Sequence, residues 1–190
     1  MTAIQVLGAF AVPYLLAWLT ALIVQRLSIL PLDAPPEMIA DNTAGRLNSR
    51  QRLALLVYNL PELVFGLTAV LIAILWRPAG LNGTVIRWGL VGMALVRLGI
   101  SWPVWRDLLA SRVVALSGPL RKIQFRQRRA LATEDGPVVV LPVERALYDL
   151  HESGVAATIY YTPHSKRVVA VVAGEAAPSA DVAFSAARQG

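Results

Sequence analysis

The sequence predicts a membrane protein with three transmembrane helices followed by a small cytoplasmic β-module of five strands, of OB or SH3-like type. Three observations lead to this fold class. Of the 190 residues, 56% are hydrophobic and 16% are charged, which is too apolar for a chain whose whole surface faces water. The apolar residues gather in three long blocks before Trp105. From about Val113, short apolar runs alternate with turn residues, the pattern typical of strands.

The transmembrane domain is expected over residues 1–110, with spans at about 4–24, 53–76 and 84–105. The first block has no charged residue, and its length suits the roughly 20 residues that cross about 30 Å of hydrocarbon. No basic residue precedes it and it exceeds the usual apolar core of a signal peptide, so we interpret it as a span rather than a cleaved signal. The other two blocks contain only Glu62, Arg87 and Arg97 as charges.

The distribution of arginine predicts the orientation, because short basic loops stay in the cytoplasm. The first connection holds Arg26, Arg46, Arg50 and Arg52, and the segment after the third span holds Arg106, Arg112 and the basic run within 121–129. Two connections separated by two spans lie on the same side of a membrane. The sequence therefore predicts a protein of the plasma (inner) membrane with its N-terminus outside and its C-terminal module in the cytoplasm.

The first connection contains Pro31, Pro35 and Pro36, which preclude a continuous helix. A plain loop is the favoured interpretation, and a short interfacial helix near residues 37–40 is the alternative.

The β-module is expected over residues 113–174. Its predicted strands are 120–125, 130–133, 137–141, 156–161 and 167–173, and a short helix from Pro142 precedes the fourth strand. Because Ala, Ser, Pro and Gly dominate residues 175–190, that tail is expected to be disordered.

The second span has one polar and small-residue face, which is expected to pack against protein while its leucine-rich side faces lipid. The face consists of Asn59, Glu62, Gly66, Ala69 and Ala73. Glu62 and Arg97 lie at equal distances from the cytoplasmic ends of their spans, about 12 to 14 Å into the membrane. An unpaired charge at that depth is costly, so we expect an intramembrane polar group of Asn59, Glu62 and Arg97. It either locks two helices together or serves proton or quinone chemistry. In a third alternative, Arg97 extends toward water or binds a lipid headgroup.

The third span has a small-residue stripe that includes Gly89, Gly92 and Gly99. On a helical wheel this stripe lies well over 90° from Arg97. It is therefore expected to pack on the first span or on another subunit.

A basic run follows in the β-module and is expected to contact anionic lipid headgroups. Its members are Arg121, Lys122, Arg126, Arg128 and Arg129. An acidic partner protein is the alternative for this run. Nucleic acid is not expected, because Phe125 is the run's only aromatic residue on which a base could stack.

The composition argues against most catalytic chemistry. The chain has no cysteine and only two histidines, so we expect no metal site, no cofactor and no catalytic residues. No residue motif points to a known family. The leading hypothesis is a non-enzymatic membrane subunit or scaffold that docks on other membrane-protein subunits or on the inner leaflet. The alternative is a subunit in proton or quinone chemistry that uses the Glu62–Arg97 pair.

Overall fold

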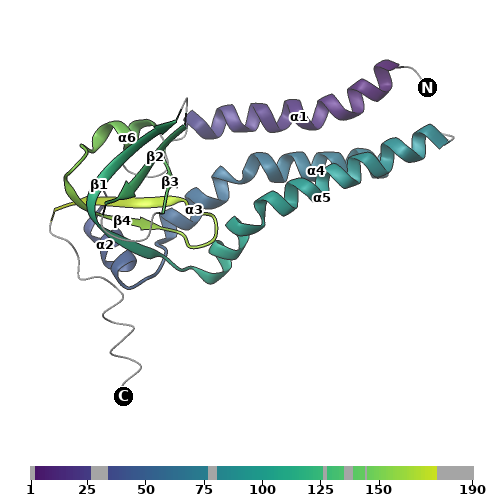
Figure 1. The fold of residues 1–190 in the computed structure, drawn as a ribbon. Coiled ribbons are helices and arrows are strands. Elements are labelled where there is room, and N and C mark those ends of the chain that lie inside the picture. Colours follow the sequence, from purple (N-terminus) through teal and green to yellow (C-terminus); the bar gives the residue numbers. More distant parts are fainter. Residues whose placement is uncertain are drawn as a thin grey trace. The chain divides into compact units, whose positions relative to one another are not determined.

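The computed structural model describes residues 3–26, 34–76, 81–125, 128–134, 139–143 and 145–174. Within these ranges it has helices followed by a five-stranded antiparallel sheet (Figure 1). The chain divides into two compact units, Met1–Ile29 with Leu53–Arg106 and Leu30–Arg52 with Asp107–Gly190. We call them the helical unit and the sheet unit. The expected disordered tail, 175–190, lies outside the described residues.

The helical unit is built from α1 (Ala3–Arg26), α4 (Leu60–Leu75) and most of α5 (Leu81–Ala110). Two segments of the described chain, Gln5–Arg26 and Gly83–Ala110, are each long and apolar enough to cross a membrane. These two candidate spans indicate a membrane protein.

The predicted second span is bent. Helix α3 (Ser49–Tyr58) and α4 meet at Asn59 with an angle of 46° between them. Pro61 has no backbone N–H and cannot bond to the carbonyl of Val57 one turn earlier, which accounts for the break. The pair is long and apolar enough to be a third candidate span when the two helices are taken as one.

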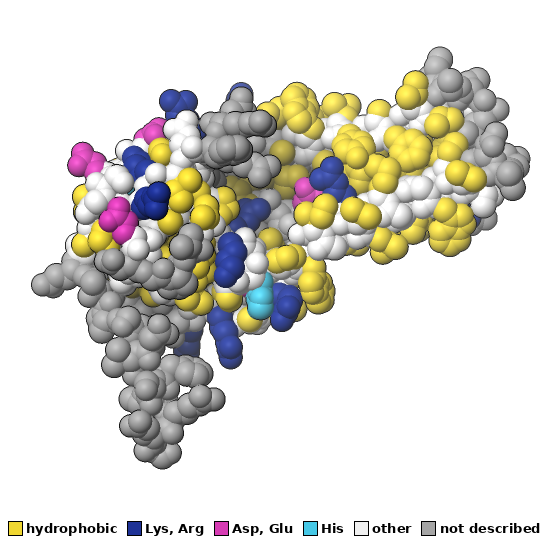
Figure 2. Space-filling model, viewed as in Figure 1, with side chains coloured by type: hydrophobic (Ala, Val, Ile, Leu, Met, Phe, Trp, Pro, Cys, Tyr) yellow, Lys and Arg dark blue, Asp and Glu magenta, His cyan; other side chains and the backbone are white. Residues whose placement is uncertain are grey.

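Small side chains form the core of the helical unit. Its buried cluster consists of Ala9, Phe65, Ala69, Ala73, Leu90 and Ala94, drawn from all three long helices. The opposite side of α4 is exposed and apolar, with Leu67 70% and Leu75 73% accessible. Yellow side chains cover the long helices in Figure 2. An exposed apolar surface of this extent is typical of helices that face lipid or another protein.

The sheet has the strand order β3-β2-β1-β4-β5, and every neighbouring pair is antiparallel. Its strands are β1 (Val114–Phe125), β2 (Arg128–Thr133), β3 (Leu141–Pro142), β4 (Ala156–Tyr161) and β5 (Val168–Ala173). The first half of β1 pairs with β4 and the second half with β2. The change of partner falls between Pro119 and Leu120, directly after Gly118, a residue type that marks bends within strands.

The core of the sheet unit lies on one face of this sheet, where α6 (Arg145–Leu150) contributes Leu147 and Tyr148. Its buried residues are Leu116, Leu120, Leu131, Leu141, Ala157, Ile159, Tyr161 and Val171. The expected third strand, 137–141, is wrong in its position: the strand begins at Leu141, and Val139 and Val140 are not in the ladder. Residues 135–138 lie outside the described residues.

The expectation of a plain loop in the first connection is also wrong. Helix α2 covers Pro36–Thr43 and belongs to the sheet unit. Pro36 stands in the first turn, where a fixed φ is already helical and a missing N–H costs nothing. Met38, 1% accessible, anchors the helix. Pro35 and Pro36 therefore start this helix rather than preventing one.

The start of α3 is capped by two side chains. Asn48 Oδ1 accepts the Arg50 N–H at 3.0 Å, and Gln51 Oε1 accepts the Asn48 N–H at 2.9 Å. This is the reciprocal arrangement of a capping box. The fully buried Gln51 also donates through Nε2 to the carbonyl of Val169 in β5, at 3.3 Å. The cap thus joins the beginning of α3 to the sheet.

Candidate functional site

Glu62 and Arg97 form an ion pair inside the helical unit. Arg97 Nη1 donates to Oε1 of Glu62 at 3.1 Å and to Oε2 at 3.2 Å. Glu62 lies in the first turn of α4 and Arg97 in the middle of α5. Both side chains are about one-third accessible. Many exposed side chains of the same unit are large and apolar. The structure therefore brings together the two charges that the sequence places at equal depth.

Two aromatic rings complete the surroundings of Arg97. The guanidinium carbon lies 5.1 Å from the ring centre of Phe65 and 5.6 Å from that of Tyr14. The two rings pack edge to face with centres 4.8 Å apart. A cation over an aromatic face gains electrostatic stabilisation, more so when water is scarce. Helices α1 and α4 therefore both contribute side chains around Arg97 of α5. Tyr14 could not be anticipated, because an isolated aromatic residue in a span is unremarkable.

Asn59 occupies the bend between α3 and α4 and is almost completely buried. Its Nδ2 has no hydrogen-bond partner within the described part of the chain. A buried amide group without a partner is costly. No hydrogen bond joins Asn59 to the Glu62–Arg97 pair among the described residues.

The small-residue positions divide into buried and open ones. Gly66, Ala69 and Ala73 of α4 are buried. A side chain at Gly66 would meet Leu98 of α5 at 3.7 Å, and one at Gly89 would meet Phe10 of α1 at 3.6 Å. The structure thus packs these positions within the unit.

Gly92 and Gly99 are different. Both are exposed, and a β-carbon at either position would meet no atom within 4 Å. Part of the α5 stripe is consequently left without a neighbour in the described chain.

The basic run does not form one continuous face in the described residues. Arg121 is exposed, while the next side chain, Lys122, lies over Tyr148 with Nζ 4.5 Å from the ring centre. The guanidinium of Arg129 is 6.0 Å from the same ring. Successive residues of a strand point to opposite faces, which separates Arg121 from Lys122. Arg126 and the side chain of Arg128 lie outside the described residues.

One buried carboxylate was missed by sequence reasoning. Asp107, in the last turns of α5, is inaccessible, and its oxygens accept the backbone N–H groups of His164 at 3.0 Å and Ser165 at 2.7 Å. Two such bonds hold the turn between β4 and β5 against the end of α5 within the sheet unit. The available signal in the sequence was that Asp107 is a single acidic residue in a stretch whose other charged residues are basic.

The same turn is closed by Thr162, which is fully buried. Its backbone N–H donates to the Arg167 carbonyl at 2.9 Å, and its Oγ1 accepts the Arg167 N–H at 3.2 Å. The neighbouring Tyr161 lies in the core, where burial raises the pKa of its hydroxyl above the usual value near 10. The turn is therefore a rigid element of the sheet unit.

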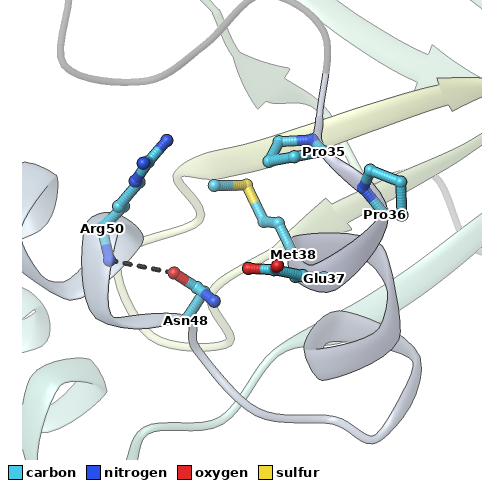
Figure 3. A pocket seen from close by; sticks show the side chains of 6 residues that line it. All are labelled: Pro35, Pro36, Glu37, Met38, Asn48 and Arg50. Carbon is cyan, nitrogen blue, oxygen red and sulfur yellow. Dashed lines mark hydrogen bonds between the residues drawn. The ribbon is translucent and has the colours of Figure 1, made fainter.

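A pocket of about 350 Å³ lies beside α2 (Figure 3). It is lined by Pro35, Pro36, Glu37, Met38, Asn48 and Arg50. Asn48 is already committed to the α3 cap and to Asp41, which its Nδ2 meets at 2.6 Å. One carboxylate and one guanidinium remain on the rim, which is no recognisable catalytic set.

No group of three His, Asp or Glu side chains within the described ranges is arranged to hold a metal ion. No family model matches the chain, no curated protein matches its sequence, and no solved structure matches its fold.

Proposed function

We propose that the chain is a non-enzymatic integral membrane subunit or scaffold. It crosses the plasma (inner) membrane three times, with its N-terminus outside, and carries a cytoplasmic five-stranded module of OB or SH3-like type. The module docks on a larger membrane complex or on the inner leaflet. One observation carries this proposal: the segment before α3 and the segment after α5 are joined by backbone hydrogen bonds.

Those bonds run in both directions. The Leu47 N–H donates to the Ser111 carbonyl at 3.0 Å, and the Val113 N–H donates to the Gly45 carbonyl at 3.0 Å. Segments that pair in this way lie on the same side of any membrane that the chain crosses. The number of crossings between residues 47 and 111 is therefore even.

This parity supports three spans. Helix α5 is long and apolar enough to cross once, and a crossing by the bent pair α3–α4 would make the number even. With α1, which also meets the length and composition requirement, the total is three. The module then lies on the side where the basic connections gather, which is the cytoplasm by the positive-inside rule.

The ion pair supports a scaffold more than a proton site. Arg97 is satisfied by both oxygens of Glu62 and by two aromatic faces. These contacts tie side chains of α1, α4 and α5 together, which is the role of a structural pair. The alternative is proton or quinone chemistry through the Glu62–Arg97 pair, and its support is the nearby Asn59, whose buried Nδ2 has no partner in the described chain.

Purification of the full chain in mild detergent, followed by mass spectrometry of co-eluting proteins, tests the proposal. A stoichiometric membrane-protein partner supports the scaffold, and a species of 20.6 kDa alone contradicts it. Glu62→Gln then separates the two functions in the recovered complex. If the complex assembles normally while a coupled proton or quinone activity falls, the alternative replaces the scaffold.

A further inference from the structure

Two exposed arginines of the sheet unit lie directly opposite each other. Arg46 and Arg112 form an isolated antiparallel backbone bridge, and both are exposed. The flanking bonds run from Leu47 to Ser111 and from Val113 to Gly45. This makes Arg46 and Arg112 a non-hydrogen-bonded pair, the kind in which the two side chains are closest and leave the backbone on the same side. We call these two side chains the arginine pair.

Like charges in this position destabilise a fold by a fraction of a kcal/mol to about 1 kcal/mol. Within the described ranges neither guanidinium forms an ion pair. The acids of the adjoining segments are engaged elsewhere. Asp41 accepts a hydrogen bond from Asn48, and both oxygens of Asp107 accept backbone N–H groups. Among the described residues, the two positive charges are thus held together without a compensating carboxylate.

A third basic residue belongs to the same region of the sheet unit. The turn held by Asp107 contains the exposed Lys166, whose Nζ lies 5.2 Å from the Tyr161 ring centre. The Ser111 N–H donates to the Asp107 carbonyl at 2.8 Å. Asp107, which holds this turn, therefore lies one helical turn before Ser111, the neighbour of Arg112. Figure 2 shows several dark blue side chains gathered on this unit.

Arg112 lies close in the sequence to the end of a candidate span. The span Gly83–Ala110 ends together with α5, and Arg112 follows two residues later. A basic residue this close to the end of a span is within reach of anionic headgroups.

We propose that the arginine pair binds the phosphate of anionic phospholipids in the cytoplasmic leaflet, with Lys166 supporting the same contact. Guanidinium groups bind phosphate through paired, charge-assisted hydrogen bonds, and a phosphate between the two arginines removes their repulsion. This inference rests on the proposed membrane topology. It assigns the lipid contact to the end of α5 rather than to the basic run after Leu120.

The test is a lipid titration of the full-length chain in detergent. Native mass spectrometry compares binding of phosphatidylglycerol and phosphatidylcholine with identical acyl chains. The wild type is expected to prefer phosphatidylglycerol. Arg46→Gln/Arg112→Gln is expected to lose about fivefold of that preference for each arginine removed, as about 1 kcal/mol per base implies. Arg46→Lys/Arg112→Lys should retain most of the preference, because the charge is kept.

Arg145→Gln is the matched control, since it removes an exposed arginine of the same unit that is paired with Asp149 at 3.3 Å. An equal loss in this variant, or no loss in the double variant, overturns the inference. Displacement of phosphatidylglycerol by an equal concentration of inorganic phosphate overturns it too, because the site then serves a soluble anion. The inference is also overturned if the double variant loses an acidic protein partner while its preference for phosphatidylglycerol stays unchanged.

The two proposals fail in different ways. Recovery of the wild-type chain without detergent defeats the proposed function and this inference together. If the chain requires detergent but the wild type and the double arginine variant have the same lipid preference, only this inference is defeated.

Discussion

Arg97 bonds to both oxygens of Glu62 through a single nitrogen, Nη1, at 3.1 and 3.2 Å. This shared donor ties α4 to α5, and the Tyr14 and Phe65 rings extend the contact to α1. A charge left alone at the middle of a span costs about 2.5 to 3.5 kcal/mol on insertion scales. The stabilisation from this ion pair therefore requires both Glu62 and Arg97.

Removing either charge alone should destabilise the helical unit. Glu62→Gln and Arg97→Leu are each expected to lower the folded yield in detergent, because each leaves its partner uncompensated. The double variant should recover much of the loss, since both charges are gone. Thermal unfolding followed by size-exclusion chromatography measures this, with exposed Glu37→Gln as the control. Additive losses in the double variant would show that the two residues act independently.

Asp107→Asn should loosen the turn between β4 and β5. An amide retains one acceptor oxygen but turns an N–H₂ group toward a backbone N–H, and an unsatisfied buried group costs about 1 to 3 kcal/mol. Hydrogen exchange of the His164 and Ser165 amides should become faster, while the β1–β2 ladder stays protected. Glu152→Gln, at an exposed position, is the control. Unchanged exchange in Asp107→Asn would show that the carboxylate is dispensable.

Gln51→Ala should lower the free energy of unfolding of the sheet unit by about 1 to 3 kcal/mol. It removes one half of the α3 cap, worth about 1 kcal/mol, and the bond to the Val169 carbonyl, worth about as much. Thermal denaturation in detergent followed by circular dichroism measures the effect. Gln124→Ala, on an exposed stretch of β1, is the control. An equal loss of stability in this variant would show that the bonds of Gln51 make no specific contribution to the free energy of unfolding.

Stability should decrease in alkali through Tyr161. Burial raises the pKa of its hydroxyl in the folded state, so above pH 10 the unfolded chain loses a proton that the folded chain keeps. The contribution is absent below about pH 10 and becomes increasingly unfavourable as the pH rises above it. Tyr161→Phe should flatten this part of the stability profile. An alkaline decline of the same slope in wild type and variant would rule out Tyr161 as its cause.

Spacing along a helix made the α4 face predictable. Gly66, Ala69 and Ala73 recur every three or four residues, and the structure buries all three. The depth comparison likewise paired Glu62 with Arg97. Both inferences use only the regular rise and rotation of a helix, so neither needs knowledge of distant contacts.

The contacts of the sheet unit were harder to anticipate. The role of Asp107 depends on a turn 57 residues away, and nothing local marks that partner. The same is true of Arg46 and Arg112, which are paired by the backbone rather than by their side chains. Helix α2 was only the less favoured alternative for a local reason: consecutive prolines usually break a helix, and Pro36 instead begins one.

Cysteine labelling in intact cells tests the topology most directly, because the natural chain has no cysteine and each introduced one is unique. Ser49→Cys, Asn82→Cys and Glu152→Cys report on the first connection, the second connection and the module. A membrane-impermeant maleimide should label only position 82 in intact cells, and positions 49 and 152 only after permeabilisation. Labelling of 49 and 152 from opposite sides would contradict the three-span account.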